Sequence, residues 1–191
     1  MSSTNGKLGK RAEEEEKVTG LVTEFLQNHN PKEMDNIAFR GARYDAGLAW
    51  VHFPEGQGGL GLRPSLQRII ERRMREAGAL PTDPTTFFMS LAGPTISTHG
   101  SEEQKKRFLK PMLTGEERWC QLFSEPAAGS DVAGLRSKAE KDGDDWIING
   151  QKVWTSGAHY SDFGILVVRH DPDIAKHKGL TFFFVDMKSP G

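Results

Sequence analysis

The chain has 191 residues, of which 36% are hydrophobic, and its 25 basic residues nearly balance 26 acidic ones, so that the net charge is −1. This length allows one or two domains with a buried core. The interleaved charges give no indication of a surface that binds nucleic acid or an anionic membrane, and the basic cluster at residues 68–75 is better explained as a solvated helix face than as a binding patch. The single cysteine, Cys120, excludes an internal disulfide and fits a reducing, cytoplasmic location.

Residues 1–17 are polar and then acidic, and they lack the apolar stretch of a secretory signal. We expect them to form a disordered tail. No apolar run elsewhere approaches the roughly 20 residues that a membrane-spanning helix needs, so the sequence predicts no membrane insertion.

Three segments after this tail show the period of an amphipathic helix. The first covers residues 18–26, with Pro31 after its end. The second covers residues 34–48 and the third residues 64–77. Gly78 follows the third segment and is suited to the left-handed conformation that commonly ends a helix.

The glycine-rich stretch from Gly56 to Gly61 predicts a loop rich in turns. It lacks the strand and helix that flank a nucleotide-binding glycine loop. Residues 85–98 are apolar and predict a buried helix, whose inward side chains would be Phe87, Phe88, Leu91 and Ile96. Residues 101–104 form a capping box that starts a further helix and contributes about 1 kcal/mol to its stability. Phe108 and Leu109 would supply the apolar side of that helix.

The period changes at Trp119, where short runs with alternating or complete burial begin. Strands are expected over residues 163–169 and 180–186, and a hairpin over residues 146–154 with its turn at Asn149-Gly150. Helices followed by antiparallel strands predict the α+β class, with an all-α helical domain over residues 18–118 and a β domain over residues 119–191.

Two hydroxyl-rich segments of the β domain are the strongest functional signal. The first segment, residues 120–131, reads Cys-Gln-Leu-Phe-Ser-Glu-Pro-Ala-Ala-Gly-Ser-Asp, and the second segment, residues 149–157, reads Asn-Gly-Gln-Lys-Val-Trp-Thr-Ser-Gly. Each combines a strand end with small or hydroxyl-bearing residues. Such strand ends can bring backbone N–H groups and hydroxyls close to a flat polar ligand.

The residues alone leave structural alternatives open. Ser124 could bind a ligand or cap the loop before Pro126, and Trp154 could contact a ligand or fill the core. Asp131 is best explained as a cap for local backbone groups. The six histidines show no metal-ligand spacing, so no metal site is predicted.

Together the two segments resemble the flavin-contacting segments of the acyl-CoA dehydrogenase family, and the resemblance extends from about Val18 to Gly191. It implies an N-terminal helical domain followed by an antiparallel β-barrel-like domain. That β domain would be incomplete in this chain, and the family's C-terminal helical domain would be absent. We therefore expect the chain to be the N-terminal half of a longer protein.

The resemblance also implies FAD as the cofactor. Phe123 and Ser124 would contact the flavin pyrimidine, Ser130 would contact both the flavin and the pantetheine of the acyl-CoA substrate, and the Ser156 hydroxyl would reach flavin N5. Many family members have Thr where this chain has Ser124 and Ser156, but the hydroxyl is kept. The implied cofactor-binding residues are Gln121, Leu122, Phe123, Ser124, Gly129, Ser130, Trp154, Thr155 and Ser156.

The activity implied by the resemblance is flavin-dependent α,β-dehydrogenation of an acyl-CoA thioester to a trans-2-enoyl-CoA. A base would remove the α-proton while the β-hydrogen leaves as hydride. The electron acceptor would be an electron-transfer flavoprotein or a similar protein, and the enzyme would be a homo- or hetero-oligomer. The oligomer implied by the resemblance would be a dimer or a tetramer.

No position in the chain matches the family's catalytic glutamate, which is expected downstream of Gly191. Glu125 is expected to support its loop. The 191-residue chain alone should therefore be inactive. The alternatives are a non-catalytic flavin- or CoA-binding subunit of a hetero-oligomer, an acyl-CoA oxidase-like relative, and a plain ligand-binding β-barrel with a helical cap.

Overall fold

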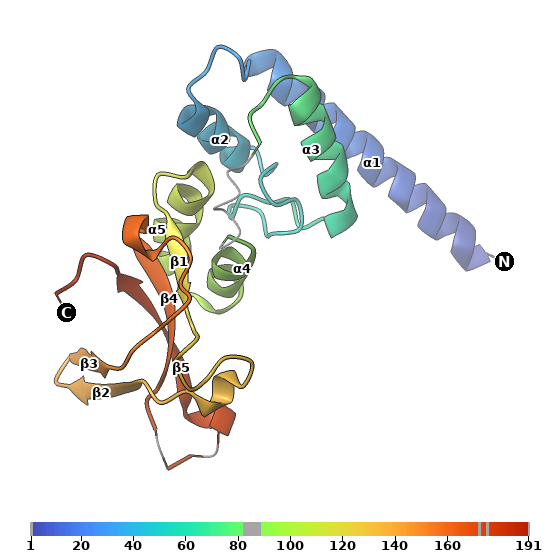
Figure 1. The fold of residues 1–191 in the computed structure, drawn as a ribbon. Coiled ribbons are helices and arrows are strands. Elements are labelled where there is room, and N and C mark those ends of the chain that lie inside the picture. The colour runs from blue at the N-terminus through green and yellow to red at the C-terminus, as the bar shows by residue number, and fades with distance from the viewer. Residues whose placement is uncertain (1, 82–88, 172, 175, 191) are drawn as a thin grey trace. The chain divides into compact units, whose positions relative to one another are not determined.

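The computed structural model describes residues 2–81, 89–171, 173–174 and 176–190, which form helices followed by a β-sheet (Figure 1). The chain divides into two compact units, residues 1–116 and residues 117–191. The order of helices before strands confirms the predicted α+β class. The unit boundary lies two residues before the domain boundary that the sequence suggests.

The helical unit contains five α-helices in its described part, and residues 46–63 form a long connection between the second and third of them. Within the described residues, every helix is too short or too polar to cross a bilayer. A 3-10 turn, Pro64–Leu66, precedes the third helix. The helices are α1 (Ser2–Asn28), α2 (Asn36–Asp45), α3 (Gln67–Glu76), α4 (Met89–His99) and α5 (Glu102–Thr114).

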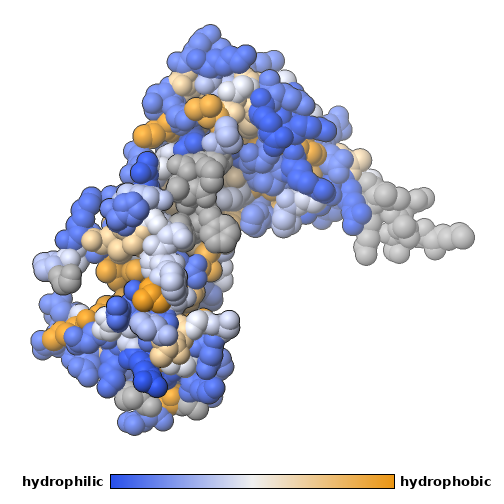
Figure 2. Space-filling view, in the orientation of Figure 1, coloured by the Kyte–Doolittle hydropathy of each residue, from blue (hydrophilic) through white to orange (hydrophobic). Residues whose placement is uncertain are grey.

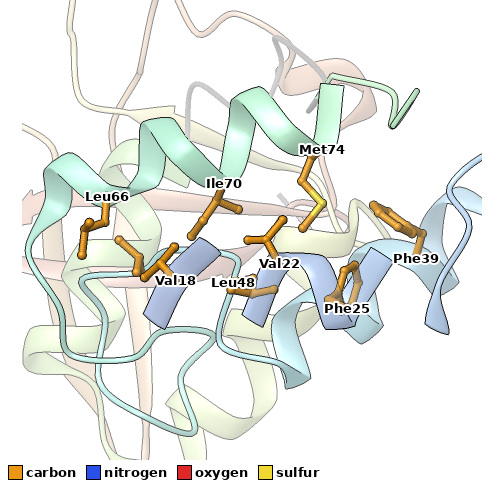
Figure 3. Close-up of a cluster of buried hydrophobic side chains, with 9 residues drawn as sticks. Val18, Val22, Phe25, Phe39, Leu48, Leu66, Ile70 and Met74 are labelled. Carbon is orange, nitrogen blue, oxygen red and sulfur yellow. The ribbon is translucent and has the colours of Figure 1, made fainter. Parts of the chain in front are cut away.

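The core of this unit forms where α1 packs against α3 (Figure 3). Val18 and Val22 of α1 face Ile70 and Met74 of α3, and all four side chains are at most 2% exposed. The spacing of Val18, Val22 and Phe25 confirms the helical face predicted from the sequence. Full burial of each such side chain contributes about 1.5–3 kcal/mol to folding.

Helix α1 starts well before the position expected from the sequence, which placed a disordered tail over residues 1–17. Arg63 explains part of this difference, because its guanidinium pairs with Glu14 at 2.8 Å and with Glu15 at 2.6 Å. The same guanidinium donates to the carbonyl of Arg11 at 3.2 Å. Arg63 is about 50 residues away from these helix residues in sequence, so the polar composition of residues 1–17 did not reveal the contact.

The helix ends follow the predicted chemistry. The Ser101 hydroxyl accepts from the Gln104 backbone N–H at 3.3 Å, and the Gln104 side chain accepts from the Ser101 backbone N–H at 2.8 Å, which confirms the capping box. Gly78 follows α3 with φ of +92°, as predicted for a helix-terminating glycine. In α4, Ile96 is buried and Leu91 is half-buried, whereas Phe87 and Phe88 lie outside the described residues.

The β unit contains a single sheet in its described part. Strands β4 and β5 have the bounds that their apolar runs predict. The sheet is open, with the order β1-β4-β2-β3 and β5 paired to β4. The strands are β1 (Trp119–Leu122), β2 (Lys138–Asp142), β3 (Asp145–Asn149), β4 (Phe163–Arg169) and β5 (Leu180–Asp186).

The strand pairing is mixed. The expected antiparallel arrangement holds for β2–β3 and β4–β5, but β4 runs parallel to β1 along four residue pairs and to β2 at one pair, Lys138 and Arg169. Parallel strands need a long connection, and the chain between β1 and β4 supplies it. This pairing joins distant residues, so a local pattern does not predict it.

The hairpin predicted over residues 146–154 is wrong. Strand β3 ends at Asn149 and pairs backward with β2, so the turn lies between Asp142 and Asp145, with Gly143 at φ of +61°. Gly150 is required for another reason. A Cβ at position 150 would lie 2.0 Å from Ser137 Oγ. Only glycine therefore allows the backbone at position 150 to approach Ser137 this closely.

Strand β3 is an edge strand with exposed apolar residues, and Trp146, Ile147 and Ile148 are 37–49% exposed. On the face shown in Figure 2, hydrophobic atoms reach the surface where the β2–β3 hairpin lies. This edge strand contrasts with β4, whose residues 164–168 are buried.

We predict that Ile70→Ala lowers the free energy of unfolding of the helical unit by about 2–5 kcal/mol, because it removes a fully buried side chain from the α1–α3 core. Ile37→Ala is the matched control, since Ile37 is 44% exposed and should cost less than about 1 kcal/mol. Urea unfolding followed by circular dichroism at a helical wavelength measures both. Equal losses would contradict the position of the core.

Candidate functional site

The two hydroxyl-rich segments lie side by side in the structure. The Val153 N–H donates to the Ser124 carbonyl at 2.9 Å, and Lys152 Nζ donates to the Phe123 carbonyl at 3.1 Å. Their close approach was expected only from the family resemblance, since 29 residues separate the two partners of each bond in sequence. The two segments therefore form one continuous candidate site.

The first segment continues directly from β1. Gln121 and Leu122 are strand residues, and Phe123 packs against a small cluster of Ala128, Leu135 and Val167. The chain then turns tightly. The Glu125 N–H donates to the Ala128 carbonyl at 2.9 Å, and the reverse bond is 3.1 Å long.

This turn leaves Gly129 and Ser130 exposed, while Ser124 is half-buried. A Cβ added at Gly129 would meet no atom within 4 Å. The backbone at Gly129 therefore borders open space, as the close approach of a ligand requires.

The second segment is irregular and ends in a turn, so the prediction that Trp154, Thr155 and Ser156 end a strand is wrong. Trp154 is 91% exposed, which excludes the alternative that it fills the core of this chain. Its φ of +59° is rare for a bulky residue. Backbone strain of this kind costs roughly 1–3 kcal/mol and gathers at functional sites.

The hydroxyls of Thr155 and Ser156 differ in accessibility. Ser156 is exposed. The Thr155 hydroxyl oxygen is buried and has no hydrogen-bond partner among the residues that the structure describes. A buried hydroxyl without a partner requires an explanation, and a ligand group is one.

A buried ion pair lies between the two segments. Lys152 Nζ is 2.7 Å from Glu125 Oε1, and the two side chains are 8% and 6% exposed. The Glu125 carboxylate also accepts from the Arg136 N–H at 2.6 Å and the Ser137 N–H at 3.0 Å. Sequence reasoning did not single out Lys152. Its signal is a lysine beside apolar Val153, in a segment that must pack against a motif glutamate.

These contacts fix the charge of Glu125. Burial by itself would raise the pKa of the carboxyl group, but hydrogen bonds from Lys152 and from the Arg136 and Ser137 backbone outweigh burial. The pKa falls from 4.5 to about 2. A buried carboxylate of this kind is a poor general base at neutral pH, which supports the expectation that Glu125 holds its loop.

The residues present fit a flavin. Ser124, Ser130 and Ser156 offer hydroxyl donors, Gly129 allows close backbone approach, and exposed Trp154 offers an apolar ring face. Among the described residues, no group of three or more histidine, cysteine, aspartate or glutamate side chains could hold a metal ion.

Comparison with known proteins identifies the family. Residues 12–116 match the family model described as "Acyl-CoA dehydrogenase, N-terminal domain", and residues 120–191 match "Acyl-CoA dehydrogenase, middle domain". The chain belongs to the acyl-CoA dehydrogenase family.

Curated relatives agree. The chain is 44% identical over 161 residues to acyl-CoA dehydrogenase FadE34 of Mycobacterium tuberculosis, a match that covers 84% of this chain and 22% of the relative. It is 42% identical over 163 residues to acyl-CoA dehydrogenase FadE29 of the same organism, which covers 85% of this chain and 41% of the relative. The chain thus spans less than half the length of these relatives.

Solved structures share the fold. The Tcur3481-Tcur3483 steroid ACAD has a TM-score of 0.63 at 29% identity, over 92% of this chain and 48% of that chain. The ChsE4-ChsE5 complex from Mycobacterium tuberculosis has a TM-score of 0.63 at 30% identity, over 93% of this chain and 48% of that chain. A glutaryl-CoA dehydrogenase from Mycobacterium smegmatis in complex with FADH2 has a TM-score of 0.58 at 23% identity, over 93% of this chain and 46% of that chain.

We predict that Glu125 stabilises the fold in a pH-dependent way. Because the pKa is lower in the folded chain than in the unfolded chain, this stability is present above pH 4.5 and is lost as the pH falls toward 2. The full contribution is up to about 3 kcal/mol. Glu125→Gln should therefore differ most from the wild type above pH 4.5, and the difference should shrink in acid.

Urea unfolding at a series of pH values measures this effect. Asp45→Asn is the control, because Asp45 pairs with Lys110 at an exposed site where both side chains are at least 43% exposed. Its effect should be small at every pH. A difference between wild type and Glu125→Gln that stays constant from pH 6 to pH 2.5 would contradict the assignment.

Proposed function

We propose that this chain forms the N-terminal half of an FAD-dependent acyl-CoA dehydrogenase that converts an acyl-CoA thioester to a trans-2-enoyl-CoA. One observation carries the proposal. The two segments that resemble the family's flavin-contacting segments are joined by hydrogen bonds, and they present an exposed tryptophan together with exposed hydroxyls.

The residues proposed to hold FAD are those of the two segments: Gln121, Leu122, Phe123, Ser124, Gly129, Ser130, Trp154, Thr155 and Ser156. When bound, FAD supplies the hydride acceptor for the reaction. The Trp154 indole would cover an apolar surface of the cofactor and keep water from it. The Ser124 and Ser156 hydroxyls would orient the cofactor by donating hydrogen bonds, and Ser130 would also contact the acyl-CoA.

The proton-abstracting base is proposed to lie outside this chain. Glu125 is the only carboxylate between Phe123 and Ser130, and its donors and low pKa leave it unsuited to accept a proton at neutral pH. We therefore expect the 191-residue chain by itself to hold flavin poorly and not to catalyse turnover.

The substrate and partners are proposed from the relatives. Similarity to a steroid acyl-CoA dehydrogenase favours a bulky acyl group, which a comparison of reduction rates with linear and ring-bearing acyl-CoA thioesters would test. Similarity to the ChsE4-ChsE5 complex favours an oligomer with a like or unlike subunit. An electron-transfer flavoprotein or a similar acceptor and a cytoplasmic location complete the proposal.

The second candidate is a subunit that binds flavin or CoA without catalysing the reaction. Family relatives that assemble as named complexes keep this alternative open. Reduction of bound flavin by an acyl-CoA thioester in the complete protein separates the two. Bleaching of the flavin supports the dehydrogenase, and stable oxidised flavin in the presence of bound acyl-CoA supports the subunit.

We predict that Trp154→Ala weakens FAD binding about 5- to 150-fold, which corresponds to the roughly 1–3 kcal/mol expected for a lost apolar contact. Because Trp154 is 91% exposed, the free energy of unfolding without cofactor should change little. Titration of the apoprotein with FAD measures the affinity. Trp146→Ala, at an exposed tryptophan of β3, is the control and should leave FAD binding unchanged.

We predict that Ser156→Ala slows flavin reduction more than it weakens acyl-CoA binding. A hydroxyl donor placed where negative charge develops stabilises the transition state more than the ground state. Stopped-flow absorbance under anaerobic conditions measures the rate at several acyl-CoA concentrations. Ser189→Ala, at an exposed serine beyond β5, is the control. An unchanged limiting rate in Ser156→Ala would remove this role.

A further inference from the structure

The Glu125–Lys152 ion pair holds three parts of the β unit together. Lys152 donates to Glu125 at 2.7 Å and to the Phe123 carbonyl at 3.1 Å. Glu125 in turn accepts from the backbone of Arg136 and Ser137. The two charged side chains thus join the first segment, the second segment and the chain just before β2.

Both proposed binding segments pass through this junction. Val153, the residue after Lys152, donates its N–H to the Ser124 carbonyl at 2.9 Å. Trp154 comes next, with its left-handed backbone and exposed indole. A strained conformation persists only where its surroundings determine it. The lysine and the adjoining backbone bond fix the chain immediately before that strained residue.

Stability alone is a weak reason for such a pair. Taking two charges out of water is costly, and well-packed apolar replacements of buried ion pairs are often neutral or stabilising. The lysine's contact with the Phe123 carbonyl has a different consequence, because it sets the spacing between the two segments. An apolar side chain at position 152 would fill space but could not donate this hydrogen bond.

We propose that Glu125 and Lys152 are positioning residues, which hold the Phe123–Ser124 and Trp154–Ser156 backbones at the separation that the flavin site needs. This inference rests on the proposed function. Neither side chain would touch the cofactor, since both are buried between the segments. Both act through the backbone segments that they join.

The test compares Lys152→Met, Glu125→Gln and the double variant Glu125→Gln/Lys152→Met in the complete protein. Each single variant leaves one uncompensated buried group, so both stability and FAD affinity should fall. The double variant removes both charges and should regain stability. The double variant still lacks the hydrogen bond that Lys152 donates to the Phe123 carbonyl. Its FAD affinity should therefore stay about tenfold or more below that of the wild type. Loss of a group that orients the ligands of a metal site lowers metal affinity by a similar factor.

Two measurements keep these effects apart. Urea unfolding of the apoprotein reports stability, and FAD titration with flavin fluorescence reports both affinity and quenching by Trp154. Lys188→Met is the matched control, because it removes a lysine from an exposed pair with Asp162, in which the lysine side chain is 76% exposed. The control should change neither readout.

Recovery of both stability and FAD affinity in the double variant would overturn the proposal, because the pair would then act through stability alone. A double variant that does not fold would also overturn the proposal, because the pair would then be required for folding itself. Single variants that bind FAD as tightly as the wild type would also exclude it. Failure of the wild-type protein to bind FAD would instead reject the proposed function itself.

Discussion

The buried strand β4 is the constraint on which the β unit depends. Its residues Ile165, Leu166, Val167 and Val168 are at most 6% exposed, and alternate side chains enter two separate apolar clusters. β5 pairs with β4 along the whole length of the strand, and β1 pairs with the first four residues of β4. Because β1 is held in this register, the first segment leaves the sheet at a fixed point, where Phe123 packs against Val167. The position of the candidate site thus follows from burial of a strand that contributes no residue to it.

Features determined by local sequence could be predicted. The continuous apolar runs gave the bounds of β4 and β5, the spacing of Val18, Val22 and Phe25 gave the buried face of α1, and the Ser101 capping box gave the start of α5. In each case neighbouring residues decide the conformation, through burial period or through a side chain that bonds the adjacent backbone.

Features determined by distant partners could not be predicted. The Asn149-Gly150 pair suggested a turn, but Gly150 lies against Ser137 after the end of β3, and the turn of the β2–β3 hairpin lies at Gly143. The N-terminal extent of α1 depends on Arg63, and the parallel pairing of β1 with β4 joins residues about 44 positions apart. A local sequence pattern does not show which residues far apart in the chain will be in contact.

The candidate site has features that local sequence determines and features that distant contacts determine. Its hydroxyls and its tryptophan could be named from the motif, yet the left-handed backbone of Trp154 contradicts what a bulky residue prefers locally. Local rules fail most often where function requires a particular geometry. The ion pair beside this residue is what makes the exception physically reasonable, because it fixes the preceding backbone from two directions.

The chemistry of that ion pair also bears on which groups would position the cofactor and which would transfer the proton in the proposed reaction. With a pKa of about 2, Glu125 keeps its negative charge at neutral pH and holds backbone donors without exchanging protons. The Glu125 carboxylate therefore keeps one charge between pH 5 and pH 8 while it holds these backbone donors. Under the proposed function, a pH dependence of turnover in that range is expected to arise from another group, such as the base that removes the α-proton. Under the proposed function, these segments fix the geometry of the cofactor, and proton transfer is assigned to a residue outside them.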